Sequence, residues 1–238
     1  MCGIAGAVAF RDGGRPDRDR LCTMAGLMAH RGPDGEGFWA DPRGRVALVH
    51  RRLSIIDIAG GRQPMCSDDG QIALVFNGEI YNYRELRRSL SDEGVQFHTA
   101  SDTEVLLRMY ERYGSEAVRY LRGMFAFAVW DGGRGELVLA RDRVGKKPLF
   151  YALEEDFCYF ASTLGALRDT DPRTPPVDLG RHQQAPRGDG AAGELLWGAF
   201  PPLLGARGRG ATLRGALRRC RRSTGRLADD RGHPAATQ

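Results

Sequence analysis

The sequence lacks the cysteine and histidine patterns that bind metals or build a disulfide framework. Its five cysteines and five histidines are widely scattered along the chain. No CxxC pair and no HExxH motif occurs among them, and an odd number of cysteines does not suit a set of bridges. We therefore predict neither a structural metal site nor stabilisation by disulfides.

Long apolar runs are also missing. No segment approaches the ~18 consecutive apolar residues of a membrane-spanning helix. The apolar stretch at 4–10 has no basic region before it and no small-residue cleavage site after it, so it does not predict a signal peptide. We expect a cytoplasmic protein that does not bind a membrane.

Residues 169–238 are poor in the amino acids that build strands. Isoleucine, tyrosine and lysine are absent there, and the segment holds a single valine and a single phenylalanine. Arginine, glycine, alanine and proline occupy 40 of its 70 positions. This composition predicts a low-complexity, disordered tail, with at most a short basic helix around 213–222.

The net positive charge of the chain belongs to this tail. The tail carries twelve arginines and seven acidic residues, an excess that equals the net charge of the whole chain, +5. An arginine-rich tail without interleaved aromatic residues lacks the groups that stack on single-stranded nucleic acid. Nucleic-acid binding is therefore a weaker expectation than disorder.

Residues 1–168, in contrast, have the periodicity of a globular domain. Helical spacing predicts helices at 20–30, 83–90 and 102–110, the first burying Leu21, Met24, Leu27 and Met28 and the last capped by Ser101 or Asp102. Short apolar runs predict strands at 72–76, 124–130, 136–140 and 157–161, with a hairpin turn at 131–135. Strands with helices between them indicate two sheets with helices outside.

Cys2 is the most informative residue. It directly follows Met1, and its small side chain permits removal of that methionine. Cys2 would then carry both a thiol and a free α-amine, and such an amine, with a usual pKa of about 7.7–8.0, can serve as the base for a nucleophile. The alternative is that Cys2 is only a small apolar residue near a chain end.

Three polar segments, at 50–57, 76–82 and 99–104, follow predicted strands, where binding residues often gather. If the substrate were glutamine, Asn77 and the backbone N–H of Gly78, which has no Cβ to block approach, could stabilise a tetrahedral oxyanion. Arg52 could pair with the α-carboxylate. Asp102 or Glu79 could pair with the α-ammonium group.

Each of these candidates also has a simpler interpretation. Asn77 and Gly78 form a common tight-turn pair. Arg52 can make a surface ion pair, Asp102 can cap a helix, and Glu79 can be a solvated charge. The simpler interpretation is favoured for each residue alone, but the set together with Cys2 favours a thiol-dependent active site.

The first 162 residues carry motifs in the order and spacing of a known family. The chain resembles the N-terminal glutamine amidotransferase domain of the asparagine synthetase family, the class II or N-terminal-nucleophile type. The motifs are Met1-Cys2-Gly3-Ile4-Ala5-Gly6, His30-Arg31-Gly32-Pro33-Asp34-Gly35, Arg52-Leu53-Ser54-Ile55-Ile56-Asp57, Gln63-Pro64, Asn77-Gly78-Glu79-Ile80-Tyr81-Asn82, Ser101-Asp102-Thr103-Glu104, Gly123-Met124-Phe125-Ala126-Phe127-Ala128 and Ala140-Arg141-Asp142-Arg143 with Gly145, Lys147, Pro148 and Leu149.

The resemblance implies an α+β fold, an αββα sandwich of two mainly antiparallel sheets flanked by helices. It implies hydrolysis of L-glutamine to glutamate and ammonia, with no metal or cofactor for this step. The Arg-Leu-Ser-Ile form favours the asparagine synthetase branch over those that make glucosamine 6-phosphate or phosphoribosylamine. The implied roles are nucleophile for Cys2, oxyanion hole for Asn77 and Gly78, and glutamine binding for Arg52, Glu79 and Asp102.

The resemblance ends after Phe160-Ala161-Ser162, where Thr163-Leu164-Gly165 replaces the usual continuation of the family. We expect an amidotransferase domain at 1–168 and a tail at 169–238. The synthetase domain of the family, which uses ATP and Mg²⁺ and a Ser-Gly-Gly-x-Asp-Ser loop, has no counterpart in this truncated sequence. We interpret the tail as a frame-shifted read-through or a degenerate remnant, which sequencing of the locus would decide.

Two functions compete on this basis. The first is glutamine hydrolysis, with the ammonia passing to a separate synthetase domain or subunit, or with the chain acting as a homodimer. The alternative is a catalytically silent fragment or interaction module, because the ATP-binding domain is absent.

Overall fold

The computed structural model describes residues 1–170 except 55, 56, 58, 59 and 155. Five strands form the first sheet, in the order β2 (Gly35–Ala40), β3 (Val46–Arg52), β1 (Gly3–Ala9), β9 (Phe157–Ala161) and β8 (Phe150–Leu153). The second sheet has the order β4 (Met65–Cys66), β5 (Ile72–Ile80), β6 (Gly123–Asp131) and β7 (Glu136–Arg141). Every strand pairing in both sheets is antiparallel. The predictions made for 171–238 lie outside the described residues.

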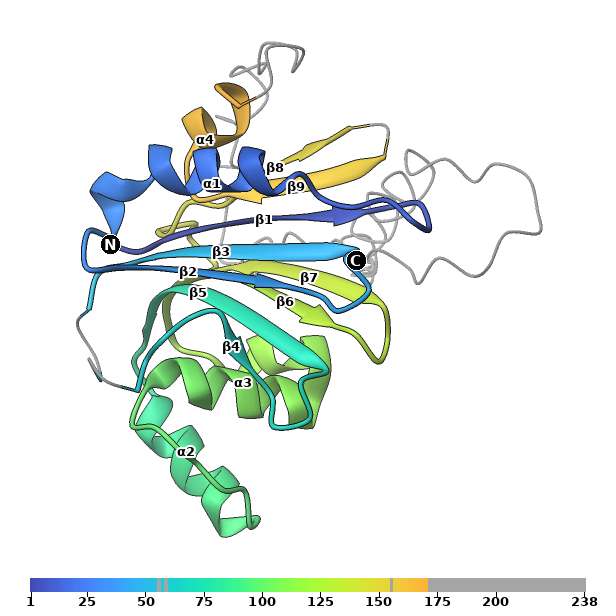
Figure 1. Cartoon of the computed structure of the whole chain (residues 1–238). Helices are drawn as coiled ribbons and strands as arrows, with labels where there is room; N and C mark the ends of the chain where they lie inside the picture. Colours follow the sequence, from blue (N-terminus) through green and yellow to red (C-terminus); the bar gives the residue numbers. More distant parts are fainter. Residues whose placement is uncertain (55–56, 58–59, 155, 171–238) are drawn as a thin grey trace, which may run out of the picture. The chain divides into compact units, whose positions relative to one another are not determined.

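Helices cover the outer faces of the two sheets (Figure 1). On the first sheet lie α1 (Arg18–Leu27), followed by the short 3-10 helix η1 (Ala29–Arg31), and α4 (Leu164–Arg168). On the second sheet lies α3 (Asp102–Tyr113), which continues into η2 (Gly114–Tyr120) and packs against α2 (Tyr83–Asp92). The predicted αββα sandwich is confirmed. No helix in the described part of the chain has the length and apolar character for crossing a bilayer.

The central strand β1 is buried on both faces. Ile4 and Val8 face the core between the sheets, whereas Ala5 faces α1, because side chains alternate along a strand. Position 6 of β1 must be a glycine because the ring of Phe160 on the neighbouring strand β9 lies very close to it. A Cβ on Gly6 would lie 2.6 Å from the ring of Phe160, its register partner. The small residues of the N-terminal segment are therefore explained by packing.

The structure corrects two local predictions and selects one of the two predicted helix caps. Leu27 was expected on the buried face of the first helix, but it is 40% exposed, and Ala25 is buried instead. The strand predicted at 72–76 extends to residue 80, so Asn77 and Gly78 lie inside β5 and the turn interpretation is wrong. Ser101 caps α3, with its Oγ accepting from an N–H 3.2 Å away. The helix predicted at 83–90 is confirmed as α2, which extends to Asp92, and the hairpin at 131–135 is confirmed.

A buried histidine connects the two sheets through a hydrogen bond between β3 and β5. His50 of β3 is almost fully buried, and its Nε2 lies 3.2 Å from the backbone oxygen of Phe76 on β5. Because the oxygen can only accept, Nε2 donates this hydrogen bond and Nδ1 has no proton in the neutral ring. The pKa of His50 is lowered from 6.5 to about 4, mainly by burial and also by the positive charge of Arg52, while the hydrogen bond to Phe76 opposes the shift.

We expect this histidine to make the fold sensitive to acid. Between pH 6.5 and pH 4 the unfolded chain binds a proton at His50 that the folded chain excludes, so stability falls as pH falls through that window. The expected loss is about 2 kcal/mol between pH 7 and pH 5. Urea unfolding of wild type and His50→Gln at both pH values would measure it. The variant, whose amide can still donate to Phe76, should lose about 2 kcal/mol less, and equal losses would contradict the prediction.

Candidate active site

Two strands of the first sheet bring Cys2 next to Arg52. The strand β1 begins at Gly3, β3 ends at Arg52, and the antiparallel register pairs Gly3 with Arg51. The residue before β1 therefore lies beside the last residue of β3. In the second sheet, β5 packs against both β1 and β3. Because His50 of β3 contacts Phe76 of β5, the residues of β5 after Phe76 lie near the end of the first sheet where Cys2 and Arg52 are.

All residues of the predicted site line one cavity of about 590 Å³. They come from the start of β1, the end of β3, the second half of β5 and the start of α3. They are Cys2, Arg52, Asn77, Gly78, Glu79 and Asp102. Met1 also lines the cavity and is 54% exposed, so it is accessible for removal. The shared cavity is a necessary condition for the predicted roles, which themselves stay predictions.

The sulfur of Cys2 is held by the segment after β3. The backbone N–H of Leu53 donates to Sγ at 3.4 Å, and Sγ lies 3.6 Å from the backbone oxygen of Leu53. The guanidinium of Arg31 donates through Nε to the backbone oxygen of Cys2 at 3.1 Å. Partial burial lowers the pKa of Arg31, and the nearby Cys2 opposes this shift.

The edge of β5 that faces away from β6 presents a row of backbone N–H groups. The first, on Phe76, donates to Oε1 of Gln63 at 2.6 Å. The last, on Ile80, donates to Oδ2 of Asp102 at 3.1 Å. Because these directions alternate along a strand, the N–H of Gly78 points to the same edge. No acceptor for it is found among the described residues, and Gly78 lines the cavity.

The register of β6 explains both the free N–H and the glycine at position 78. Gly78 pairs with Phe125, whose N–H and C=O are both engaged by Asp142 on the far side. The backbone groups of Gly78 therefore point away from β6. A Cβ on Gly78 would overlap the backbone oxygen of Met124. The sequence prediction explained this glycine by ligand approach, whereas the structure explains it by the close neighbouring strand.

A second unpaired donor lies next to this N–H. Asn77 is 1% exposed, and its Nδ2 is buried with no hydrogen-bond partner among the described residues. Its side chain shares the face of Ala73 and Val75, which pack against the first sheet. A buried amide without a partner costs about 1–3 kcal/mol. Such a cost is typical of a site that is completed by a ligand atom.

The segment that carries Arg52 is attached at several points. Besides the contact of Leu53 with Cys2, the N–H of Ser54 donates to Asp34 at 2.8 Å. Arg52 itself donates through Nη2 to the backbone oxygen of Asp57 at 2.7 Å. Arg52 is half-buried at the cavity, where its guanidinium can bind a carboxylate in a fork geometry.

Asp102 and Glu79 supply negative charge at the other side of the cavity. Asp102 is the first residue of α3, and its carboxylate is not the helix cap, because Ser101 fills that position. Burial raises the pKa of Asp102, the N–H of Ile80 opposes this shift, and the nearby charge of Glu79 adds to it. A cationic group in the cavity would relieve both the burial and the repulsion.

Two further polar residues of this cavity, Gln63 and Lys147, were not among the predicted site residues. Gln63 donates from Nε2 to Thr103 at 3.3 Å while its Oε1 holds the edge of β5, so it connects β5 to α3. The sequence signal that could have identified Gln63 was its place in the Gln63-Pro64 motif of the family. Lys147 is 5% exposed, with no ion pair among the described residues. The backbone N–H of Lys147 donates to Asp142 at 2.9 Å, which holds the turn after β7 against the cavity.

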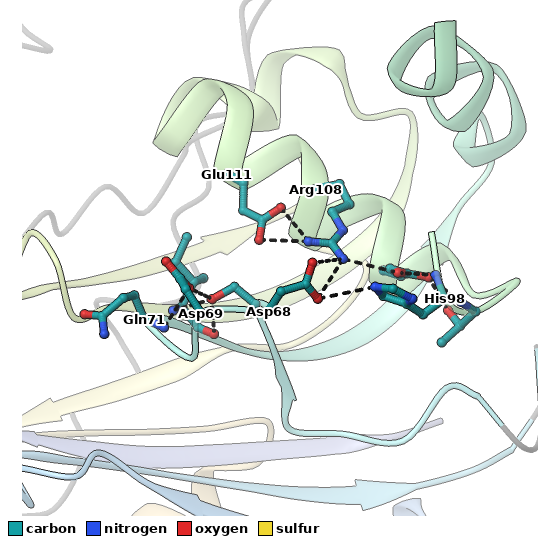
Figure 2. Close-up of polar contacts among 10 residues, drawn as sticks. Asp68, Asp69, Gln71, His98, Arg108 and Glu111 are labelled. Atoms are coloured by element: carbon teal, nitrogen blue, oxygen red, sulfur yellow. Dashed lines mark hydrogen bonds and ion pairs between the residues drawn. The ribbon is translucent and has the colours of Figure 1, made fainter. Parts of the chain in front are cut away.

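A polar cluster away from the cavity holds α3 in place. Figure 2 shows Arg108 of α3 between Asp68 and Glu111, with His98 beside Asp68. Arg108 donates to both carboxylate oxygens of Asp68, at 3.1 and 2.9 Å, and this joins α3 to the turn between β4 and β5. The cluster thereby fixes the helix that begins at Asp102. No group of side chains in the described ranges is arranged to hold a metal ion.

Comparison with known sequences identifies the domain. The family model described as "Glutamine amidotransferase domain" matches residues 1–181. Asparagine synthetase 3 (glutamine-hydrolysing) of Bacillus subtilis is 42% identical over 169 residues, which cover 70% of this chain and 27% of that protein. Asparagine synthetase 1 of the same organism is 45% identical over 164 residues, or 68% and 26%. The chain therefore spans about a quarter of the length of these curated relatives.

Solved structures agree on the fold. The glutamine phosphoribosylpyrophosphate amidotransferase of B. subtilis aligns with a TM-score of 0.59 at 24% identity, covering 71% of this chain and 43% of that one. A structure described as the allosteric regulatory enzyme of purine biosynthesis aligns with a TM-score of 0.57 at 26% identity, with the same coverage. Together with the family match over most of the sequence, these results show that the chain belongs to the glutamine amidotransferase domain family.

Proposed function

We propose that this domain hydrolyses L-glutamine to glutamate and ammonia through a thioester on Cys2. The observation that carries the proposal is a pair of donors, Asn77 Nδ2 and the Gly78 N–H, that have no hydrogen-bond partner in the described part of the chain. Both residues line the cavity that also contains the Cys2 thiol. Two such donors are the arrangement that a tetrahedral oxyanion requires. The names of the curated relatives, which describe glutamine hydrolysis, support the same substrate.

The proposed reaction uses only groups of the chain and water. After removal of Met1, the α-amine of Cys2 takes the thiol proton while Sγ attacks the side-chain carbonyl of glutamine. The oxyanion accepts hydrogen bonds from Asn77 and Gly78. The carbon–nitrogen bond then breaks, the ammonium form of the amine gives its proton to the leaving nitrogen, and ammonia departs. A water molecule attacks the thioester and releases glutamate and the thiol.

The α-groups of glutamine fit the charges at the two sides of the cavity. The guanidinium of Arg52 is proposed to bind the α-carboxylate, and Asp102 with Glu79 is proposed to bind the α-ammonium group. These contacts are remote from the reacting carbonyl. The contacts to the α-groups orient the side-chain carbonyl of glutamine toward Sγ of Cys2, and this positioning lowers the barrier of the reaction.

The direct test is an assay of purified protein whose N-terminal mass shows that Met1 has been removed. The proposal predicts equal amounts of glutamate and ammonium from L-glutamine, and none when Met1 is retained, because the proposed base is then an amide nitrogen. Absence of hydrolysis by protein with a free Cys2 amine would overturn the proposal. It would favour the catalytically silent module, which the family match does not favour.

We expect glutamine binding to weaken in acid because of Asp102. Its pKa is raised by burial and by Glu79, so its carboxylate becomes neutral at a higher pH than an ordinary aspartate. A neutral side chain cannot pair with the α-ammonium group, so the Kd for glutamine should rise as pH falls through the raised pKa, with proton release on binding. Calorimetry on the Cys2→Ala protein would measure this. Asp102→Asn should bind about tenfold more weakly near pH 7 and show a flatter pH dependence.

The acceptor of the ammonia is a separate part of the proposal. The relatives are named for asparagine synthesis, and the part of them that aligns with this chain is about a quarter of their length. We propose that the ammonia serves this reaction in a synthetase domain or subunit that acts together with this domain, in the cytoplasm, and that ATP and Mg²⁺ are needed only there. The hydrolysis itself is proposed to need no cofactor, since the thiol, amine and oxyanion donors supply each step.

A further inference from the structure

We propose that Asp57 is a positioning residue that fixes the spacing between the groups that bind the two α-substituents of glutamine. The proposal builds on the proposed function and adds a residue to the same site. Asp57 is outside the set predicted for glutamine binding, although it ends one of the quoted motifs. It connects the segment that carries Arg52 with the segment that leads into Asp102.

Asp57 accepts four hydrogen bonds from described residues, and they run in two directions. Its backbone oxygen accepts from Arg52 Nη2 at 2.7 Å and from the N–H of Gly61 at 2.9 Å. Its Oδ1 accepts from the N–H of Gly60 at 2.8 Å, which closes a local turn. Its Oδ2 accepts from the N–H of Ala100 at 2.8 Å, across 43 residues of sequence. One residue therefore touches the proposed carboxylate-binding guanidinium and the loop that ends at Asp102.

The backbone of Asp57 supports a special role for this residue. Its φ is 44°, the one left-handed non-glycine residue in the described part of the chain. This conformation is uncommon and is tolerated best by asparagine and aspartate. It persists where surrounding contacts determine it. The N–H groups of Gly60 and Ala100 are such contacts, and with the charge of Arg52 they lower the pKa of Asp57, so its carboxylate is ionised near neutral pH.

The loop at 98–101 is held from both sides. Glu104 accepts from the N–H of His98 at 2.8 Å and from the N–H of Thr99 at 2.6 Å, both on the helix side. The next N–H, on Ala100, is the one that Asp57 accepts. Ser101 then caps the helix. Arg87 of α2 also holds this loop, through the backbone oxygen of Thr99 at 2.6 Å. Asp57 differs from that partner because it contacts Arg52 as well, so it links the loop before α3 directly to the guanidinium.

This arrangement has a consequence for specificity. An α-amino acid presents its carboxylate and ammonium groups at a fixed separation, so the two binding groups must keep a matching separation. Without the Asp57 contacts, Arg52 and Asp102 should still be present, but the distance between them should no longer be fixed. Misplacement of this kind weakens recognition of the α-groups and can cost up to about a hundredfold.

The test compares Asp57→Asn, which tolerates the left-handed backbone but cannot accept both N–H groups at full charge, with the matched control Asp69→Asn. Asp69 is another turn aspartate, which accepts from Ser67 Oγ and from the N–H of Gln71 outside the cavity (Figure 2). The substrates are glutamine and 4-carbamoylbutanoate, which lacks the α-amine. For Asp57→Asn, we expect KM for glutamine to rise about tenfold, kcat to change less than about twofold, and the preference for glutamine to fall about tenfold.

The control should keep wild-type values in each measurement. Unchanged KM and preference in Asp57→Asn, or a fall of kcat with constant KM, would overturn the proposal. Asp57→Gly, which also permits the positive φ but has no carboxylate, serves as a second variant and should show the larger effect. A merely destabilised protein would lose activity toward both substrates in proportion.

A readout that needs no activity separates this proposal from the proposed function. Ala100 is exposed, so its amide is protected from hydrogen exchange only through the hydrogen bond to Asp57. Its exchange should become faster in Asp57→Gly and stay slow in Asp69→Asn. If wild type neither binds nor hydrolyses glutamine, the proposed function fails, while this result would still support the attachment of the loop. Equal exchange in all three proteins would overturn the attachment itself.

Discussion

Replacement of Cys2 by alanine is expected to lower kcat/KM for glutamine by at least about 10⁴-fold, because removal of a nucleophile removes the covalent route entirely. The residual rate should be that of water in a cavity that still offers the Asn77 and Gly78 donors. The affinity for glutamine should change little, since Arg52, Glu79 and Asp102 are untouched. Ammonium release and calorimetric binding, measured on the same preparations, would separate the two quantities.

The chain offers a matched control for this substitution. Cys22 is a free, exposed cysteine on α1 that does not line the cavity. Cys22→Ala should keep full activity, which excludes a general effect of thiol loss. Intact-mass measurement during turnover should detect a γ-glutamyl adduct on wild type and on Cys22→Ala, but none on Cys2→Ala. Hydrolysis by Cys2→Ala at the wild-type rate would contradict the thioester route.

Replacement of Asn77 by alanine is expected to lower kcat by about 10²–10³-fold with KM changed less than about twofold. The reason is the state of its Nδ2, which is buried and has no partner among the described residues. A donor that gains its acceptor only when negative charge develops on the substrate stabilises the transition state and not the bound substrate. Steady-state kinetics with glutamine would measure the effect on kcat and KM separately.

Asn82 provides the control for this second prediction. It belongs to the same motif, but its amide is already engaged, donating to the backbone oxygen of Tyr120 and accepting from the N–H of Arg122, both at 2.9 Å. Asn82→Ala should therefore reduce stability and leave kcat of the folded protein unchanged. A similar fall of kcat in both variants would show that the effect comes from folding and not from the oxyanion site.

Sequence reasoning predicted the layers of the fold and the candidate residues, and the reasons are visible in particular elements. The helical spacing in α2 and the glycine-rich turn between β6 and β7 are local sequence signals, and the structure contains both the helix and the hairpin that they predict. The alternative interpretation of Asn77 and Gly78 as a tight turn was wrong, because a pair typical of turns is held in the strand β5 by its register with β6. Tertiary pairing here overrides a local preference.

The residues that the sequence did not predict act across long distances in the chain. Gln63 links the backbone of Phe76 to Thr103, and Asp57 links Arg52 to Ala100. Such contacts depend on how β5 and α3 meet, and no periodicity or spacing within one segment contains that information. The roles of the six predicted site residues are therefore best tested together with these connecting residues.

The strand β1 also has a consequence for how the protein is made. One edge of the strand that follows Cys2 pairs with β9, the last strand of the domain, and directly after β9 Ser162 accepts from the N–H of Ile4 at 3.0 Å and donates to the backbone oxygen of Ile4 at 2.8 Å. The other edge of β1 pairs with β3, which is made much earlier. One edge of β1 therefore stays open until β9 has left the ribosome, so the sheet that positions the nucleophile closes only near the end of translation of the domain.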